Sequence, residues 1–221
     1  MITKVVIQIV IFAAFGMLLF IAAGTLRWPA AWVLIAEMGA GSIALGLWLR
    51  RHDPSLLVER LSVHYQAPWD KALVGALIIS SIGSFVLMAF DAVRFHWSEI
   101  PLSVRVVGAF LILLSIYFNY LVFRENTFAA PAVKIQTERG HWVVSTGPYA
   151  YVRHPMYTGI VFFYIGVPLL LGSWYGLAAA MFSLYILAVR VVLEERTLMA
   201  ELAGYREYVE RVRYRLIPGI W

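Results

Sequence analysis

Apolar and polar segments alternate along the chain, and six apolar stretches stand out as candidate membrane helices. They are Val5–Ala23, Ala30–Leu49, Ala72–Phe90, Val106–Phe123, Met156–Leu171 and Trp174–Leu193. The first four are long enough to cross a hydrocarbon core of about 30 Å, which takes about 20 helical residues. The fifth is short and meets the sixth at the sequence GSWYG, so these two are predicted to form a helical hairpin. The pattern predicts an all-α integral membrane protein with about six hydrophobic helices.

The polar segments carry patterns of their own. Residues 50–69 are polar and amphipathic, and we expect them to lie along the membrane interface. Residues 124–152 form the longest non-spanning segment, in which VKIQ and HWVV have short β-like character. A loop of this length in a compact protein usually has a function. After the sixth stretch, apolar residues recur at spacings of 4, 3, 4 and 3, which predicts an amphipathic helix folded back onto the protein or the membrane surface. These residues are Leu198, Leu202, Tyr205, Val209 and Val212.

Composition and charge support a membrane location and suggest an orientation. Hydrophobic residues make up 62% of the 221 positions, far above an ordinary soluble domain. Basic residues collect after the second, fourth and sixth stretches, whereas the alternate loops hold little beyond Arg27 and Arg94. Excess Lys and Arg marks the cytoplasmic side. We therefore expect a multi-pass protein with both termini cytoplasmic, in the inner or plasma membrane if its source is prokaryotic. Bands of basic residues at the membrane edges account for the net positive charge of the chain, so no nucleic-acid partner is expected.

Several chemistries are excluded by what the sequence lacks. Without cysteine there is no disulfide, thiolate metal site or cysteine nucleophile. The histidines are His52, His64, His96, His141 and His154. None of them lies four residues from another, so no helical zinc site and no other metal site is expected. Gly39-Ala40-Gly41 lies in an apolar stretch with no preceding strand and is rejected as a dinucleotide fingerprint.

One acidic residue, Glu37, lies inside the second apolar stretch. An ionisable group at that depth is costly and is often functional. We interpret Glu37 as a carboxylate bonded to a neighbouring helix, with a functional role as the alternative.

The segment GPYAYVRHPMYTG, residues 147–159, combines turn formers with aromatic and imidazole rings. A residue before proline is disfavoured in the α region, so His154 is predicted to be extended and Pro155 to occupy the first helical position. The free backbone N–H groups of a helix start favour an anion, and tyrosine faces attract cations. The rings around this helix start are those of Tyr149, Tyr151, His154 and Tyr157. S-adenosylmethionine, with a carboxylate and a cationic centre, suits such a place; a tyrosine-rich interfacial belt is the alternative.

Three charged residues lie at the end of the sixth stretch: Arg190, Glu194 and Glu195. Arg190 and Glu194 are four apart and share one helix face. Spacing alone favours an exposed ion pair that caps a membrane helix.

Together these motifs resemble the isoprenylcysteine carboxyl methyltransferase family and the wider group that contains the phospholipid methyltransferases. The matching residues, in order, are Arg153, His154, Pro155 and Tyr157, then Glu194, Glu195, Gly204, Tyr205, Tyr208, Arg215 and Pro218. The resemblance covers about the last hundred residues, and the front helices match only in being hydrophobic. It implies a single membrane methyltransferase domain over residues 1–221, with scaffold helices in 1–101 and a catalytic core in 102–221.

The resemblance also implies a cofactor, an acceptor and site residues. S-adenosyl-L-methionine would enter a non-Rossmann, all-helical site from the cytosol. The acceptor, the carboxylate of a prenylated cysteine or a similar lipophilic molecule, would come from the bilayer and its lipids. Cofactor-binding positions by motif are Gln136, His141, Trp142, Val143, Val144, Tyr149, His154, Pro155, Met156 and Tyr157. Counted back from Gly204, the family's cofactor-binding glutamate corresponds to Glu195. The family's four-residue spacing from its substrate-binding arginine, which corresponds to Arg190, selects Glu194 instead. Both glutamates are kept as candidates.

The acceptor decides which of these residues are catalytic. Displacement at a sulfonium needs chiefly alignment and a dry pocket. A carboxylate needs no general base, and Arg190 could hold it bidentately. A phospholipid amine or a thiol would need deprotonation by Glu194, Glu195 or His154. The remaining alternatives are an NADPH-dependent membrane sterol-type reductase, whose ending is similar, and a non-enzymatic scaffold. The sequence indicates no oligomeric state.

Overall fold

The computed structural model describes residues 2–62 and 67–221, and throughout this part of the chain it is helical, without strands. The elements are α1 (Ile2–Ala23), α2 (Pro29–His52), α3 (Pro54–Arg60), α4 (Pro68–Ala89), the π-helical turn η1 (Phe90–Phe95), α5 (Leu102–Glu125), the 3-10 turns η2 (Thr137–Arg139) and η3 (Gly147–Ala150), α6 (Pro155–Leu171), α7 (Trp174–Glu201) and α8 (Tyr205–Arg211). The predicted all-α membrane fold is confirmed.

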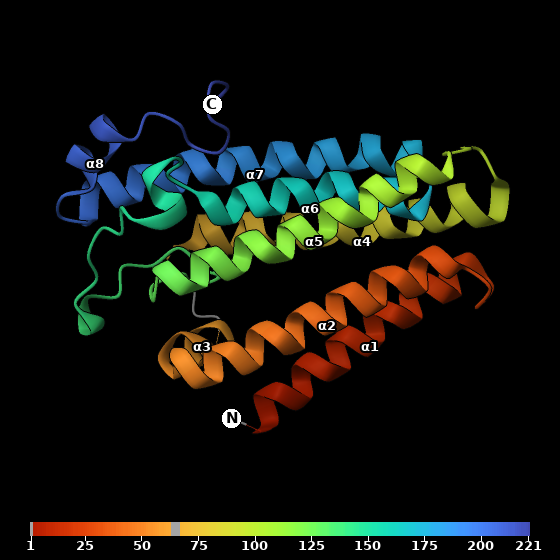
Figure 1. The fold of residues 1–221 in the computed structure, drawn as a ribbon, viewed down its shortest axis with the longest axis horizontal. Helices are drawn as coiled ribbons and strands as arrows, with labels where there is room; N and C mark the ends of the chain where they lie inside the picture. The colour runs from red at the N-terminus through yellow and green to blue at the C-terminus, as the bar shows by residue number, and fades with distance from the viewer. Residues whose placement is uncertain (1, 63–66) are drawn as a thin grey trace.

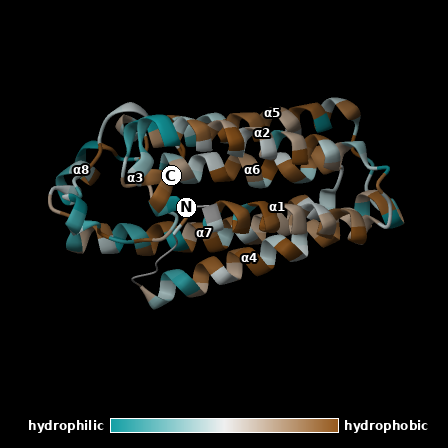
Figure 2. Ribbon diagram, turned by 90° about the horizontal axis from the view of Figure 1, so that it is seen from below, coloured by the Kyte–Doolittle hydropathy of each residue, from teal (hydrophilic) through white to brown (hydrophobic). Residues whose placement is uncertain are grey.

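The predicted apolar stretches correspond to α1, α2, α4, α5, α6 and α7. In the part of the chain that the structure describes, five helices are long and apolar enough to cross a membrane: Thr3–Ala23, Pro29–His52, Pro68–Phe95, Leu102–Glu125 and Trp174–Glu201. Hydrophobic residues run along the middle of these helices, and the hydrophilic ones gather toward the ends (Figure 2). The chain is therefore a multi-pass membrane protein.

The predicted hairpin joins α6 and α7 through a two-residue turn. Gly172 ends α6 with a φ of +91°, a conformation that glycine adopts without a Cβ clash. Ser173 caps α7 by accepting a hydrogen bond from the backbone N–H of Gly176 at 2.7 Å. The 17 residues of α6 make it too short to accompany the whole of α7, which has 28.

The membrane helices share one hydrophobic core, to which α1, α2, α4, α5 and α6 contribute. Figure 1 shows α1 and α2 on one side of α4 to α7, and both pack against this bundle: α1 lies against α4, and α2 lies against α5 and α6. The N-terminus, α3, the long loop after α5 and α8 gather at one end of the molecule, and the short connections gather at the other. This arrangement brings the basic segments together, as the charge pattern requires. Their cytoplasmic location stays a prediction.

α5 and α6 pack with their backbones in contact at two glycines. A Cβ on Gly108 would lie 2.4 Å from the Leu170 backbone nitrogen and 2.6 Å from the Gly166 carbonyl oxygen. A Cβ on Gly166 would lie 2.8 Å from the Gly108 carbonyl oxygen. Small residues at helix interfaces permit such close approach in membranes. The contact fixes α6, whose first turn belongs to the candidate site.

A polar cluster lies at the opposite end of the bundle. Asp91, in η1, is fully buried. One of its oxygens, Oδ2, accepts hydrogen bonds from Ser98 Oγ at 2.7 Å and from Ser173 Oγ at 2.5 Å. Asp91 therefore ties η1 to the turn between α6 and α7.

The amphipathic tail folds back onto the protein in two helices rather than one. Gly204, with a φ of +80°, separates α7 from α8. The predicted apolar stripe nevertheless packs as one cluster, because Leu202, Tyr205, Tyr208 and Val212 all contact Ile135 or one another in the core. Beyond α8, the chain crosses the start of α6.

HWVV, residues 141–144, is not a strand: it has no ladder partner among the described residues, and its side chains contribute to a pocket instead. The interpretation of Glu37 as bonded to a neighbouring helix is wrong, since its buried Oε2 has no hydrogen-bond partner within the described structure. Residues 63–66, which include His64 and part of the predicted interfacial segment, lie outside the described residues.

Candidate functional site

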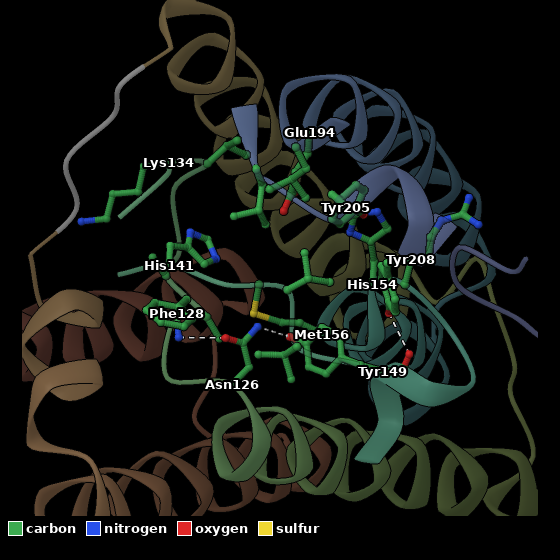
Figure 3. Close-up of a pocket in the computed structure, with 18 of the residues that line it drawn as sticks. Asn126, Phe128, Lys134, His141, Tyr149, His154, Met156, Glu194, Tyr205 and Tyr208 are labelled. Atoms are coloured by element: carbon green, nitrogen blue, oxygen red, sulfur yellow. Dashed lines mark hydrogen bonds between the residues drawn. The ribbon is translucent and has the colours of Figure 1, made fainter. Parts of the chain in front are cut away.

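A pocket lies at the polar end of the bundle, between the loop after α5, the start of α6, the end of α7 and α8 (Figure 3). It encloses about 740 Å³ of space, counting the solvent at its mouth. Its lining residues are Asn126, Phe128, Ala129, Ala130, Ala132, Val133, Lys134, His141, Trp142, Val143, Val144, Tyr149, Arg153, His154, Met156, Tyr157, Glu194, Leu198, Leu202, Tyr205 and Tyr208.

The His-Pro pair positions a ring at the pocket as predicted. α6 begins at Pro155, and His154 precedes it with φ −127° and ψ 63°. The tail holds this helix start, because the His154 backbone N–H donates to the Arg215 carbonyl at 2.9 Å. His154 is 6% exposed, and its Nε2 has no hydrogen-bond partner among the described residues. Glu195 Oε1 lies 3.8 Å away, beyond hydrogen-bond distance.

A second buried polar atom without a partner lies in the same wall. Tyr205 is 4% exposed, and no described group bonds its hydroxyl. Burial raises the pKa of Tyr205, and the carboxylates of Glu195 and Glu194 raise it further, so the phenol keeps its proton. The neighbouring Tyr208 differs: its hydroxyl donates to the Tyr149 carbonyl at 2.7 Å. Buried polar groups normally have hydrogen-bond partners, so the Tyr205 hydroxyl and His154 Nε2, which has only the 3.8 Å contact with Glu195, are candidate ligand contacts.

The two adjacent glutamates have different environments. Glu194 lines the pocket and accepts a hydrogen bond from the Tyr157 hydroxyl. Glu195 does not line the pocket and is 2% exposed. Its carboxylate accepts from Arg153 Nε and, at 2.6 Å, from Arg215 Nε. Glu195 therefore joins the start of α6 to the tail.

Arg190 lies behind the pocket and is neither exposed nor paired with Glu194. It is 5% exposed, and its Nε donates to Asp70 Oδ1 at 2.8 Å. Its Nη1 donates to the Tyr157 hydroxyl at 2.6 Å, and its Nη2 to the Pro131 carbonyl at 2.9 Å. The expected exposed ion pair is wrong because the Tyr157 hydroxyl bonds both Arg190 and Glu194 and stands between them.

Aromatic rings form much of the remaining wall. His141 stacks on Phe128 with ring centres 4.3 Å apart, and Trp142 meets Phe128 edge to face at 4.6 Å. Burial, aided by Arg139, lowers the pKa of His141 to about 4, so this ring is neutral near pH 7. Asn126 Nδ2 donates to the Tyr149 hydroxyl at 2.8 Å (Figure 3).

The structure brings most of the predicted site residues together. Those that line the pocket are His141, Trp142, Val143, Val144, Tyr149, His154, Met156, Tyr157 and Glu194. Those that do not are Gln136, Pro155, Arg190 and Glu195. Gln136 is fully buried in the loop, where its Nε2 donates to the Phe128 carbonyl at 2.9 Å and its Oε1 accepts from Arg139 at 2.5 Å. Tyr151, included in the predicted ring cluster, is 72% exposed and outside the lining.

Sequence reasoning missed residues on both sides of the pocket. The loop wall from Asn126 to Lys134 has no motif. Tyr205 and Tyr208 match the family pattern, but the motifs predict no pocket role for either. The front half also reaches the site: Arg60 Nη1 donates to the Ala129 carbonyl at 2.8 Å. Asp70 of α4 contacts Arg190, and nothing local in the sequence signals that pairing.

The chain matches the phospholipid methyltransferase family (PEMT) over residues 104–206, which include all of α6 and α7. A protein-S-isoprenylcysteine O-methyltransferase of Saccharomyces cerevisiae is 28% identical over 167 residues, which cover 74% of this chain and 67% of the yeast protein. A solved structure of the eukaryotic intramembrane Ras methyltransferase ICMT (isoprenylcysteine carboxyl methyltransferase) is similar to this chain, with a TM-score of 0.48 and 17% identity. The alignment covers all of this chain and 87% of the ICMT chain.

The family match and the yeast relative show that the second half of the chain is similar to proteins of the phospholipid methyltransferase group. The resemblance to the isoprenylcysteine carboxyl methyltransferase family that the motifs predict is confirmed at this level of similarity.

Proposed function

We propose that this membrane protein is a methyltransferase that transfers a methyl group from S-adenosyl-L-methionine to the carboxylate of a prenylated cysteine or a similar lipophilic molecule. The observation that carries the proposal is the pair of buried, unpartnered polar atoms, His154 Nε2 and Tyr205 Oη, in the wall of the pocket at the start of α6. His154 belongs to the R-H-P-x-Y motif that this chain shares with the family.

The pocket residues fit S-adenosyl-L-methionine. Tyrosine and phenylalanine faces suit an aromatic base and attract a sulfonium. Glu194 forms no ion pair with a described Lys or Arg, so its carboxylate is available to a cationic centre. When bound, the cofactor supplies an electrophilic methyl group on sulfur.

The protein's own contribution is alignment and exclusion of water. His154 and Tyr205 offer hydrogen bonds to the polar parts of the bound molecule. Tyr157 is held from two sides, because its hydroxyl accepts from Arg190 and donates to Glu194. Fixed orientation of two reactants in a dry site is the main requirement for a displacement at a sulfonium.

Arg190 is suited to the acceptor side. A guanidinium has five N–H donors, and three of them are used by Asp70, Tyr157 and Pro131. One N–H on each Nη nitrogen is left to bind a carboxylate. A carboxylate is already a nucleophile, so this arrangement needs no general base. The Tyr157 hydroxyl then fixes the acceptor arginine relative to the cofactor pocket.

A phospholipid amine is the second candidate acceptor. Glu194 favours it, because a pocket carboxylate without an arginine or lysine partner is a suitable base for an ammonium group. The phospholipid methyltransferase family match also favours methyl transfer over reduction by NADPH.

Two measurements test the proposal. Titration calorimetry of the purified protein in detergent is expected to show binding of S-adenosylhomocysteine and not of NADPH. The His154→Ala and Tyr157→Ala variants are each expected to bind S-adenosylhomocysteine more weakly than the wild-type protein does. Labelled methyl transfer is then compared on S-farnesylcysteine with a free carboxylate, on its amide and on phosphatidylethanolamine. Label in a base-labile ester of the free acid supports the proposal. Label on the amine, or no binding of S-adenosylhomocysteine, contradicts it.

A further inference from the structure

Asp70 lies in the first turn of α4, in the half of the chain that the sequence marks as scaffold, yet it contacts the site. It is fully buried, and both of its carboxylate oxygens are used. Oδ1 accepts from Arg190 Nε at 2.8 Å, and Oδ2 accepts from the Val133 backbone N–H at 2.8 Å. Val133 lines the cofactor pocket. One carboxylate thus binds the candidate acceptor arginine and a wall of the cofactor pocket.

A buried carboxylate at this place is expensive. Removal of two charges from water costs several kcal/mol per ion in proteins. Apolar residues could fill the same place in a membrane protein without that cost. An ion pair of this kind is weak support for stability, since well-packed apolar residues often serve as well. Stability alone therefore does not account for a buried carboxylate at this place.

The contacts of Asp70 leave one orientation for the guanidinium of Arg190. Asp70 takes the Nε–H, and the Pro131 carbonyl takes an N–H of Nη2. Pro131 and Val133 belong to the same loop, so the loop and Asp70 hold Arg190 together. Rotation of the guanidinium would break both bonds at once. The N–H groups left for an acceptor then point in one fixed direction.

We propose that Asp70 is a positioning residue for methyl transfer. It touches neither reactant. It orients the Arg190 guanidinium toward the acceptor and, through the Val133 N–H, sets the position of that arginine relative to the cofactor pocket. This inference rests on the proposed function, in which Arg190 holds the acceptor.

Asp70→Asn is the first test, because asparagine keeps the shape and can still accept from Val133 N–H while losing the charge. Affinity for S-adenosylhomocysteine is expected to stay within about twofold, and kcat/KM for the lipophilic carboxylate to fall about tenfold or more, as for a lost charged hydrogen bond. Asp91→Asn is the matched control: it is equally buried in the same apolar run and far from the pocket. It is expected to lower the thermal midpoint and to leave kcat/KM unchanged.

A double-mutant cycle separates positioning from general support. If Asp70 acts through the guanidinium, Asp70→Asn combined with Arg190→Lys has the kcat/KM of Arg190→Lys alone. If the two changes multiply, they act independently, and the positioning role is overturned. It is also overturned if Asp70→Asn has normal kcat/KM, or if its affinity for S-adenosylhomocysteine falls in proportion to its turnover.

A binding measurement without turnover keeps this inference distinct from the proposed function. The wild-type protein is expected to bind S-farnesylcysteine acid more tightly than its amide, and Asp70→Asn to lose that preference. A preference retained in Asp70→Asn overturns the positioning role. A wild-type protein that shows the preference but transfers no methyl group contradicts the proposed function and leaves Asp70 only as the residue that orients Arg190 toward an anionic ligand.

Discussion

Glu194 and Glu195 are neighbours in the chain with opposite surroundings: the first faces the pocket, and the second is enclosed between Arg153 and Arg215. Successive residues of an α-helix differ by about 100° around its axis, so one turn of α7 serves two purposes. It presents one carboxylate to the pocket and uses the next to attach the tail. The two residues should therefore respond differently to the same substitution.

Glu195→Gln is expected to destabilise the fold. It leaves the buried Arg153 without its carboxylate, a loss of about 3–5 kcal/mol for a broken buried pair. Glu194→Gln is expected to leave the thermal midpoint in detergent nearly unchanged. It is expected to lower the affinity for S-adenosylhomocysteine about tenfold, as for a lost charged contact. Thermal unfolding with and without the ligand measures both effects. A stable Glu195→Gln variant with selectively weakened ligand binding would reverse the assignment.

Tyr205→Phe and Tyr208→Phe form a second matched pair. The Tyr205 hydroxyl has no hydrogen-bond partner among the described residues. Its loss is therefore expected to lower the affinity for S-adenosylhomocysteine by about two- to tenfold, the value of one hydrogen bond, and to leave stability unchanged. The Tyr208 hydroxyl bonds the Tyr149 carbonyl, and its loss is expected to cost about 1–3 kcal/mol of folding free energy. Calorimetry and thermal unfolding separate the two. Equal ligand affinity in wild type and Tyr205→Phe would exclude the hydroxyl from the site.

Arg190→Lys is expected to separate catalysis from cofactor binding. Lysine keeps the charge beside Asp70 but lacks the planar fork that binds a carboxylate at two points. A lost charge-assisted bond of roughly 1.5–3 kcal/mol corresponds to about a tenfold to hundredfold fall in kcat/KM. S-adenosylhomocysteine binding should barely change, since Arg190 does not line the pocket. Near-normal turnover of the lysine variant would favour an amine or a neutral thiol as acceptor.

The pH dependence of stability should include a contribution from His141. Its pKa in the folded protein is about 4, below the ordinary 6.5. Between these values the unfolded chain binds a proton that the folded chain does not, so stability falls as the pH falls from about 6.5 toward 4. His141→Gln is expected to flatten this part of the profile, measured as the thermal midpoint against pH. An unchanged slope in the glutamine variant would show that other groups produce it.

Orientation can be tested with two exposed glutamates at opposite ends of the bundle. The native chain has no cysteine, so Glu138→Cys in the pocket loop and Glu99→Cys between η1 and α5 each introduce one thiol. In sealed cells, an impermeant reagent is expected to label Glu99→Cys, and to label Glu138→Cys only after permeabilisation. The reverse pattern would place the pocket on the outer side.

Local rules predicted the parts of this molecule that depend on neighbouring residues. Hydropathy located the membrane helices, and proline geometry located the start of α6 at Pro155. Helical spacing predicted the packing of the tail, although Gly204 divides it. These features are fixed by a few consecutive residues and by the membrane.

The rest depends on contacts between distant segments. Asp70 and Arg190 are 120 positions apart, and no local pattern pairs them. The choice between Glu194 and Glu195 depends on where the tail lies. Gln136 resembled a site residue by its type, but the loop turns its amide toward Arg139 and the Phe128 carbonyl. Sequence alone could place these side chains near the pocket, but not decide which of them face it.

The short α6 has a consequence for the bilayer itself. Its 17 residues span about 25 Å at 1.5 Å per residue, a few ångströms less than a hydrocarbon core of about 30 Å. The last turns of α7 continue for about 16 Å beyond the start of α6. With the hairpin turn at one membrane surface, the floor of the pocket lies below the headgroups of the other leaflet. Hydrophobic mismatch would then act directly on the site. Methyl transfer in vesicles should rise as the acyl chains of the host lipid shorten toward the length of α6 and decline as they lengthen, so lipid chain length would physically control the proposed reaction.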